Sequence, residues 1–217
     1  MHRKILWWIT RAKDMVRDGF HGVDTSAVMP KEVPNVLGDH SAFYTYDPTP
    51  WKVLTRVLRL ALLPTKDFTF VDIGCGKGRI VLSALAHPFA RVVGVEFSPY
   101  LCSIARKNLS AARFLPRLCV DAQIICIDAV QYPIPEAPLV FFFYNPFAQK
   151  VVEGVLANIV RSYLAKCRPI YLIFYATSTH LPFISHFLKY NSDNKARQYR
   201  SMVVGRRTVY IFELPGN

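Results

Sequence analysis

The chain of 217 residues lacks any apolar stretch long enough to cross a membrane. A spanning helix needs about 18 consecutive apolar residues, and the richest run, Leu139 to Tyr144, stops at Asn145-Pro146. The apolar run at 5–9 is too short for a secretory signal. We therefore expect a chain without a transmembrane segment, located in the cytoplasm.

The sequence also lacks the cysteine and histidine spacings of a metal site. Its 5 cysteines include no C-x-x-C pair, and an odd number without a disulfide framework is typical of a reducing compartment. No histidine is placed by the sequence to activate Cys75 as a nucleophile. We expect no metal, and we interpret Cys75 as a small side chain near a ligand.

Acidic residues are scarce. The chain has 15 Asp and Glu against 27 Lys and Arg, a formal net charge of +12. Such a charge favours an acidic or anionic partner, although a solvated basic surface explains it equally well. No basic segment carries the interleaved aromatic residues of a nucleic-acid module. Because of the basic charge, nucleic acid is still kept as an alternative partner.

The most informative segment is a glycine-rich turn that follows a buried strand. The apolar run 68–71 ends in an acid, three alternate glycines follow, and a helical pattern begins near Arg79. Glycine has no Cβ, so such a turn brings the backbone close to a ligand. The candidate ligand-binding residues of the turn are Asp72, Gly74, Cys75, Gly76 and Gly78.

The spacing of these glycines indicates which ligand to expect. A dinucleotide-binding turn has G-x-G-x-x-G, and a phosphate loop ends in Gly-Lys-Ser/Thr. In this chain the third glycine comes one residue earlier, and no hydroxyl residue follows Lys77. An acid followed by G-x-G-x-G resembles the first motif of the class I S-adenosylmethionine-dependent methyltransferases. The resemblance implies S-adenosyl-L-methionine as donor, S-adenosyl-L-homocysteine as product, and no metal.

Two further apolar runs also end in an acid. The run 90–95 is followed by Glu96, about 20 residues beyond the turn, and an acid at this place in a βαβ unit accepts hydrogen bonds from ribose hydroxyls. The run 122–127 is followed by Asp128, which the resemblance places at the adenine amino group. A solvated strand end or a turn residue is the alternative for both acids. Phe97 and Ala129, the residues after the two acids, complete this set.

Apolar runs and helical patterns alternate through most of the chain. This order predicts an α/β fold with a doubly wound, mostly parallel sheet and an antiparallel terminal strand. It is the seven-stranded, Rossmann-like architecture of the methyltransferases that the chain resembles. Strands are expected up to Cys75 and at 90–96, 122–128, 139–145, 169–176, 197–204 and 207–214, and helices at 51–63, 79–86, 99–112, 148–166 and 180–190.

The first 50 residues differ from the rest. Residues 1–18 have the pattern of an amphipathic helix, and its tryptophans and basic residues also suit contact with a membrane surface. Residues 19–50 are rich in turn formers. We expect residues 1–50 to form an extension and residues 51–217 to form an S-adenosylmethionine-binding methyltransferase domain.

The end of the run at 139–145 is a candidate acceptor site, because ligands of such sheets bind at the carboxyl ends of the strands. Its Tyr144-Asn145-Pro146-Phe147 resembles the Asn/Asp-Pro-Pro-Tyr/Phe motif of amino-group methyltransferases, with one proline fewer. It is also similar to the same strand end in seven-stranded lysine methyltransferases. The resemblance implies that Asn145 and Tyr144 orient the acceptor amine, with Asn145 also near the donor. A plain Asn-Pro turn is the alternative.

The segment 44–50 adds a further resemblance. A Tyr/Thr/Pro segment, a helix and then the glycine motif is similar to the order in the Dot1-like lysine methyltransferases. In that family the segment folds over the methionine end of the donor, which implies contacts from Tyr46 and Thr49. We therefore favour a protein lysine as methyl acceptor, with nucleic acid, a small amine or a non-catalytic basic binding module as alternatives.

Overall fold

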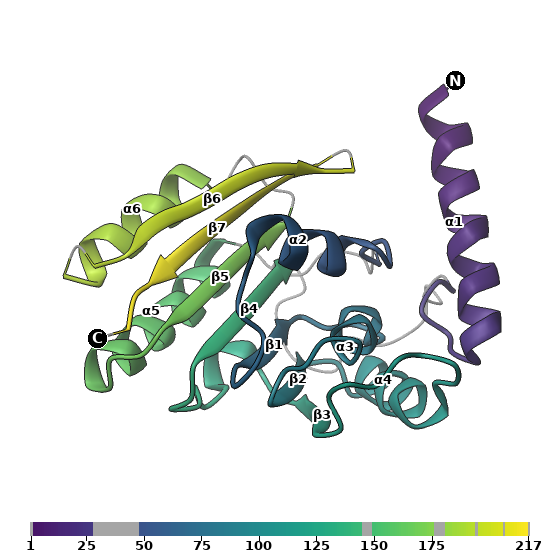
Figure 1. The fold of residues 1–217 in the computed structure, drawn as a ribbon, viewed down its shortest axis with the longest axis horizontal. Helices are drawn as coiled ribbons and strands as arrows, with labels where there is room; N and C mark the ends of the chain where they lie inside the picture. Colours follow the sequence, from purple (N-terminus) through teal and green to yellow (C-terminus); the bar gives the residue numbers. More distant parts are fainter. Residues whose placement is uncertain are drawn as a thin grey trace.

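The computed structural model describes residues 2–27, 48–144, 149–175, 181–193, 195–205 and 207–216, with side-chain surroundings for all but 2–10, 181–183 and 190. Within these ranges the strands form one sheet in the order β3-β2-β1-β4-β5-β7-β6 (Figure 1). The strands are β1 (Thr69–Ile73), β2 (Arg91–Glu96), β3 (Ala122–Cys126), β4 (Leu139–Tyr144), β5 (Ile170–Tyr175), β6 (Arg197–Val204) and β7 (Arg207–Leu214).

The directions of the strands confirm the expected fold class. Strands β1 to β5 run parallel to their neighbours, β7 is antiparallel to β5, and β6 is antiparallel to β7. The terminal hairpin has the predicted bounds of 197–204 and 207–214. The chain therefore has the doubly wound, seven-stranded sheet of a Rossmann-like fold.

Helices cover both faces of the sheet, which explains why its strands are continuous apolar runs. Alternate residues of β1 enter opposite cores, Phe70 on the side of α2, α3 and α4, and Val71 and Ile73 on the side of α5 and α6. The helices are α1 (His2–His21), α2 (Val53–Ala61), α3 (Arg79–Ala84), α4 (Pro99–Ala111), α5 (Gln149–Ala165) and α6 (Leu181–Asn191), with a 3-10 helix η2 (Ala129–Gln131) before β4.

The strand order creates the place where a ligand can bind. From β1 the chain moves outward to β2 and β3, and then returns to the opposite side of β1 as β4. The carboxyl ends of β1 and β4 therefore flank a reversal of strand order, where ligands of open α/β sheets bind. The glycine turn follows β1 directly at this edge.

Some element bounds differ from those expected. The first strand ends at Ile73 rather than at Cys75, because Gly74 takes a φ of 75°. The third strand ends at Cys126, because Asp128 caps η2 by accepting a hydrogen bond from the next helical turn.

Helices α1, α2 and α3 also differ from the expected ranges, and α3 ends at Ala84 instead of residue 86. Helix α1 continues to His21 instead of ending at residue 18. Helix α2 begins at Val53 and ends at Ala61, because Leu62 takes a left-handed φ of 54° and its N–H donates back to Arg59. In the part of the chain that the structure describes, no helix is long and apolar enough to span a membrane.

Gly94 gives a direct test of the packing between α3 and the sheet. A Cβ at this position would lie 2.7 Å from Val81 and 2.8 Å from both Cys75 and Ile124. We expect Gly94→Ala to lower the free energy of unfolding by about 1–3 kcal/mol through overpacking, measured by urea denaturation. Gly19→Ala is the matched control, because a Cβ there meets nothing within 4 Å. Equal losses in the two variants would contradict this account.

Candidate active site

The turn after β1 takes its shape from glycines in the left-handed region. The φ angles are 75° at Gly74, 55° at Gly76 and 84° at Gly78, values that residues with a side chain rarely adopt. The N–H groups of Gly74 and Cys75 both donate to the Val95 carbonyl at 2.9 Å. The backbone of the turn therefore requires alternate glycines, and β2 holds the turn in place.

Glu96, at the end of β2, is bonded to this turn. Its Oε2 accepts from the Gly76 N–H at 3.0 Å and its Oε1 accepts from the Ser98 N–H at 2.9 Å. The residue is 6% exposed, and burial raises the pKa of its carboxyl, while hydrogen bonds from backbone N–H groups act in the opposite direction. A carboxylate has about four acceptor sites, so Glu96 retains capacity to accept from a ligand hydroxyl as well as from the backbone N–H groups.

Asp72 lies in β1 with its carboxyl buried in the same region. Burial and the nearby charge of Glu96 together hold the pKa of Asp72 well above its usual value. Among the described residues none donates a hydrogen bond to this carboxyl. Two buried acids placed in this way favour a cationic ligand, because a positive charge stabilises the ionised form of both.

Cys75 does not have the properties of a nucleophile. It is buried in the turn, and its Sγ lies 3.8 Å from the Gly76 carbonyl. Burial and the charges of Asp72 and Glu96 raise the pKa of the Cys75 thiol well above its usual value. Since the thiolate is the reactive form, Cys75 acts as a small packing residue within the glycine turn.

The structure places Asp128 and its neighbour at the end of β3, one strand beyond Glu96. The Oδ1 atom of Asp128 accepts from the Val130 N–H at 2.9 Å, while the residue as a whole is exposed. Ala129 is buried at the start of η2. Phe97 follows Glu96, is half-buried, and its carbonyl lies 3.8 Å from the Cys126 Sγ. These residues line the same edge of the sheet as the turn.

On the other side of the reversal, aromatic rings gather with one arginine. Tyr144 ends β4 and pairs with Tyr175 at the end of β5, with ring centroids 5.3 Å apart. The Cζ of Arg207, the first residue of β7, lies 5.0 Å from the Tyr144 ring centroid and 6.0 Å from that of Tyr175. Sequence reasoning found Tyr144 but missed Tyr175 and Arg207, which only the sheet order brings to it.

Of the other residues expected at the site, the structure describes Thr49 alone. Tyr46, Asn145, Pro146 and Phe147 lie outside the described residues. Thr49 is buried, and its carbonyl belongs to a network described next.

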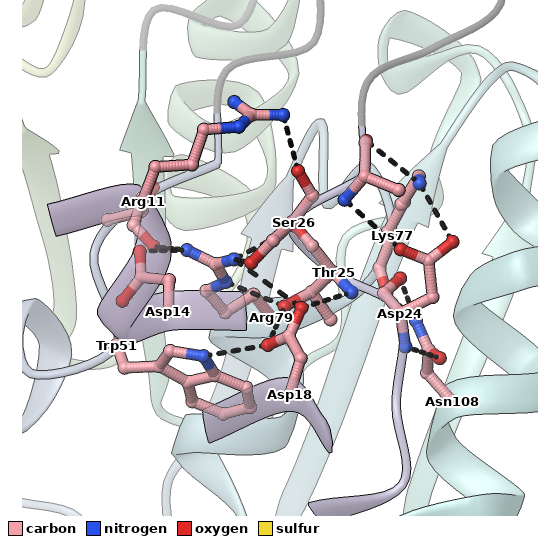
Figure 2. Close-up of polar contacts among 12 residues, drawn as sticks. Arg11, Asp14, Asp18, Asp24, Thr25, Ser26, Trp51, Lys77, Arg79 and Asn108 are labelled. Carbon is pink, nitrogen blue, oxygen red and sulfur yellow. Dashed lines mark hydrogen bonds and ion pairs between the residues drawn. The ribbon is translucent and has the colours of Figure 1, made fainter. Parts of the chain in front are cut away.

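Two basic side chains, Lys77 in the glycine turn and Arg79 directly after it, bind the N-terminal segment, as Figure 2 shows. Arg79 is 2% exposed. Its Nε donates to the Thr25 hydroxyl at 2.7 Å, its Nη1 to Asp14 at 2.8 Å and to the Thr49 carbonyl at 3.2 Å, and its Nη2 to the Ser26 hydroxyl. The Arg79 guanidinium therefore connects α1, the segment after α1 and the segment that leads into α2.

Asp18 of α1 organises the same network from the acidic side. One carboxyl oxygen accepts from the Thr25 N–H at 2.7 Å, and the other accepts from the Thr25 hydroxyl at 2.8 Å and the Trp51 indole at 3.0 Å. Its carboxyl lies 3.8 Å from Arg79, whose guanidinium is 5.6 Å from the Trp51 ring centroid. The Arg79 guanidinium and both carboxyl oxygens of Asp18 thus have hydrogen-bond partners, as burial of charge requires.

Lys77 makes the second link. Its Nζ donates to Asp24 at 3.0 Å and to the Ala27 carbonyl at 3.1 Å (Figure 2). The Asn108 amide of α4 donates to the carbonyls of Lys77 and Asp24, both at 2.9 Å. The segment 24–27 is thus held between the glycine turn and α4. A basic residue inside a ligand-binding turn looks like a ligand contact in the sequence, so no sequence signal predicted this role.

Arg79 is expected to be a major contributor to stability. We expect Arg79→Ala to lower the free energy of unfolding by about 3–5 kcal/mol, because it leaves Asp14 and Asp18 buried without their cation. Arg91→Ala is the control, since Arg91 pairs with Asp121 at 3.4 Å with both side chains about half exposed, and such pairs contribute less than about 1 kcal/mol. Denaturation curves that show similar losses for both variants would refute the role of Arg79.

Comparison with known proteins agrees with this geometry. Residues 70–164 match the family described as a methyltransferase domain. A protein-lysine N-methyltransferase from Saccharolobus islandicus is 34% identical over 100 residues, which cover 45% of this chain and 58% of that protein. A ribosomal protein L11 methyltransferase from Photobacterium profundum is 26% identical over 99 residues, 41% of this chain and 34% of that protein. The matches thus span less than two thirds of either relative.

A solved structure extends the similarity beyond the matched segment. The crystal structure of an RNA methyltransferase from Salinibacter ruber in complex with S-adenosyl-L-homocysteine has a TM-score of 0.57 and 22% identity, covering 78% of this chain and 94% of that one. At this identity the likeness concerns the fold. The glycine turn, the strand order and the family match together confirm the expected class: residues 70–164 carry a methyltransferase domain, within the fold of the class I S-adenosylmethionine-dependent methyltransferases.

Proposed function

We propose that this chain transfers a methyl group from S-adenosyl-L-methionine to the amino group of a lysine in a protein. The observation that carries the proposal is the glycine turn bonded to Glu96 beside the reversal of strand order, with an aromatic strand end on its other side. The similarity to the lysine methyltransferase from Saccharolobus islandicus supports an amine acceptor. RNA is the second candidate, supported by the fold of the Salinibacter ruber enzyme and by the net charge of +12.

The residues at the carboxyl ends of β1, β2 and β3 fit the proposed donor. S-Adenosyl-L-methionine, when bound, supplies a methyl group on a positively charged sulfur that is already activated for transfer. We propose that Glu96 accepts from the ribose hydroxyls and that Asp128, with Ala129, meets the adenine. Asp72 and Glu96 fit a cation because burial disfavours their ionised forms and raises their pKa, and a nearby positive charge stabilises those ionised forms. Tyr46 and Thr49 are proposed for the methionine end.

The acceptor must arrive without a proton. A lysine ammonium has no lone pair, so the site must favour the neutral amine. The guanidinium of Arg207, 5.0 Å from the Tyr144 ring centroid, places a positive charge beside the proposed acceptor position, and a like charge disfavours the ammonium form. We propose that Tyr144 and Asn145 orient the amine in line with the methyl group, since catalysis of such a transfer is mainly positioning.

The extension and the domain are proposed to act together. We propose residues 51–217 as the methyltransferase domain and residues 1–50 as an extension that docks on it through Arg79 and Lys77. A cytoplasmic location and an acidic partner remain part of the proposal.

Labelled methyl transfer tests the acceptor. The chain is incubated with a cell extract and donor carrying a labelled methyl group, and the products are digested with protease or with nuclease. We expect label that is released by protease, resists nuclease and appears as methyl-lysine after hydrolysis. Label that survives protease and is lost with nuclease would replace protein with nucleic acid as acceptor. Absence of donor binding in calorimetry, with the chain folded, would overturn both enzyme proposals.

Donor affinity is expected to depend on the ionisation of Glu96. An ionised carboxylate accepts hydrogen bonds from ribose hydroxyls more strongly than a protonated carboxyl does, so affinity should fall as pH decreases through the pKa of Glu96. Because burial raises that pKa, the fall should begin at a higher pH than an exposed glutamate would give. Calorimetry with S-adenosyl-L-homocysteine between about pH 8 and pH 5 measures it.

Two variants separate the role of Glu96 from general effects of acidity. Glu96→Gln should weaken binding at neutral pH by about tenfold, equivalent to about 1.4 kcal/mol, and should flatten the pH dependence. Glu136→Gln, which removes an exposed carboxyl paired with Lys166, should change neither. A Glu96→Gln profile that follows the wild-type profile at unchanged affinity would remove the ribose role.

A further inference from the structure

Exposed apolar side chains gather where the end of α1 meets the connection between α4 and β3. Phe20 is 65% exposed and Phe114 is 75% exposed, and their ring centroids lie 5.3 Å apart. Val16, one helical turn before Phe20, is also largely exposed, as is Leu118 further along the connection. These four residues, Val16, Phe20, Phe114 and Leu118, are called the apolar rim below.

The apolar rim is held in place by the fold. The Arg113 N–H donates to the His21 carbonyl at 2.8 Å, and the His21 Nδ1 lies 3.0 Å from the Arg113 carbonyl. These bonds fix the connection to the end of α1. Phe114 has a φ of 55°, a left-handed conformation that costs a bulky residue about 1 kcal/mol or more. The backbone thus holds an aromatic ring in solvent at a position where glycine would be less strained.

Basic residues outnumber acids next to the apolar rim, and the exposed acids nearest to it in the sequence, Asp24 and Asp121, are paired with Lys77 and Arg91. Arg113 and Arg117 flank Phe114, Arg106 and Lys107 lie on the exposed side of α4, and Lys13 is exposed on α1. The sequence from 97 to 120 contains no Asp or Glu.

The acids of α1 do not offset this charge. Asp14 and Asp18 are directed at the buried Arg79, with side chains 17% and 7% exposed. The outer surface of this region therefore carries cations around an apolar centre.

We propose that this surface binds an anionic membrane surface. Cations next to a bilayer that contains anionic lipid contribute about 1 kcal/mol each, and apolar side chains that enter the headgroup layer add to the affinity. Lipid fits better than a folded protein partner, because side chains that stand this far into solvent can enter a fluid layer without a matching surface. It also fits better than RNA, because Val16 and Leu118 are aliphatic and offer no ring for base stacking.

The position of α1 supports the same partner. Figure 1 shows the amino-terminal half of α1 standing clear of the sheet. The sequence of that half combines Trp7 and Trp8 with Arg3 and Lys4, a composition used by helices that lie in a membrane interface. Since Arg79, the residue directly after the glycine turn, donates a hydrogen bond to Asp14 of α1, membrane-bound α1 would hold the donor site near the lipid surface. Membrane binding itself does not rest on the identity of the methyl acceptor.

Vesicle binding tests the proposal with the full chain. Co-sedimentation is measured with phosphatidylcholine vesicles and with vesicles that contain about 30 mol% phosphatidylglycerol. We expect binding to the anionic vesicles alone, weakening as salt is added. We expect the double variant Phe20→Ser, Phe114→Ser to bind about tenfold more weakly, and Arg113→Glu, Arg117→Glu to lose binding as well.

The matched control substitutions are on α2 and at Leu62, the residue directly after it. Leu62→Ser removes an aliphatic side chain that is 76% exposed at a residue with a φ of 54°, and Arg56→Glu, Arg59→Glu reverses two exposed charges. Both should bind anionic vesicles as the wild type does, with melting temperatures confirming that every variant is folded.

Other outcomes would overturn the proposal. It is wrong if anionic and neutral vesicles bind equally, if neither binds, or if the control variants lose as much affinity as the variants of the apolar rim. Single-stranded RNA that binds in a manner sensitive to Phe114→Ser, with no vesicle binding, would assign the surface to nucleic acid instead.

Discussion

A single buried guanidinium, that of Arg79, connects the parts of this molecule that lie far apart in the sequence. It bonds to residues 54 and 65 positions earlier in the chain, at Thr25 and Asp14. An arginine stays charged in proteins, so its burial requires the acids of α1 to be in place. Because Arg79 is also the first residue of α3 and follows Gly78 directly, the N-terminal helix and the donor turn are parts of one cooperative unit.

Local patterns in the sequence predicted most of the fold. Apolar runs that end in an acid located β1, β2 and β3, and the two strands expected at 197–204 and 207–214 form the terminal hairpin at those bounds. The Arg79 network was not predictable in this way, because it consists of contacts between residues with no periodic relation. Lys77 and Arg79 follow glycines in a ligand-binding motif, and only the position of Asp24 and Thr25 shows that they serve the extension.

The residues of the candidate site also differ in whether the local sequence predicts them. Residues contributed by one strand end, such as Glu96 and Tyr144, carry a signal in their own neighbourhood, since an acid or a polar turn interrupts an apolar run. Tyr175 and Arg207 carry none, because they join Tyr144 only through the order β4-β5-β7. Sequence reasoning therefore identifies residues at the ends of β1 to β3 more completely than those that meet at the ends of β4, β5 and β7.

The two buried carboxyls beside the turn have a consequence for turnover. Asp72 and Glu96 each have a raised pKa because burial removes their carboxyls from water. In the reaction proposed for this chain, the sulfur loses its positive charge when the methyl group leaves. The attraction between the sulfur and the two carboxyls is then reduced at the moment the product forms. The electrostatics of this site therefore favour release of the demethylated product and its replacement by a new donor molecule.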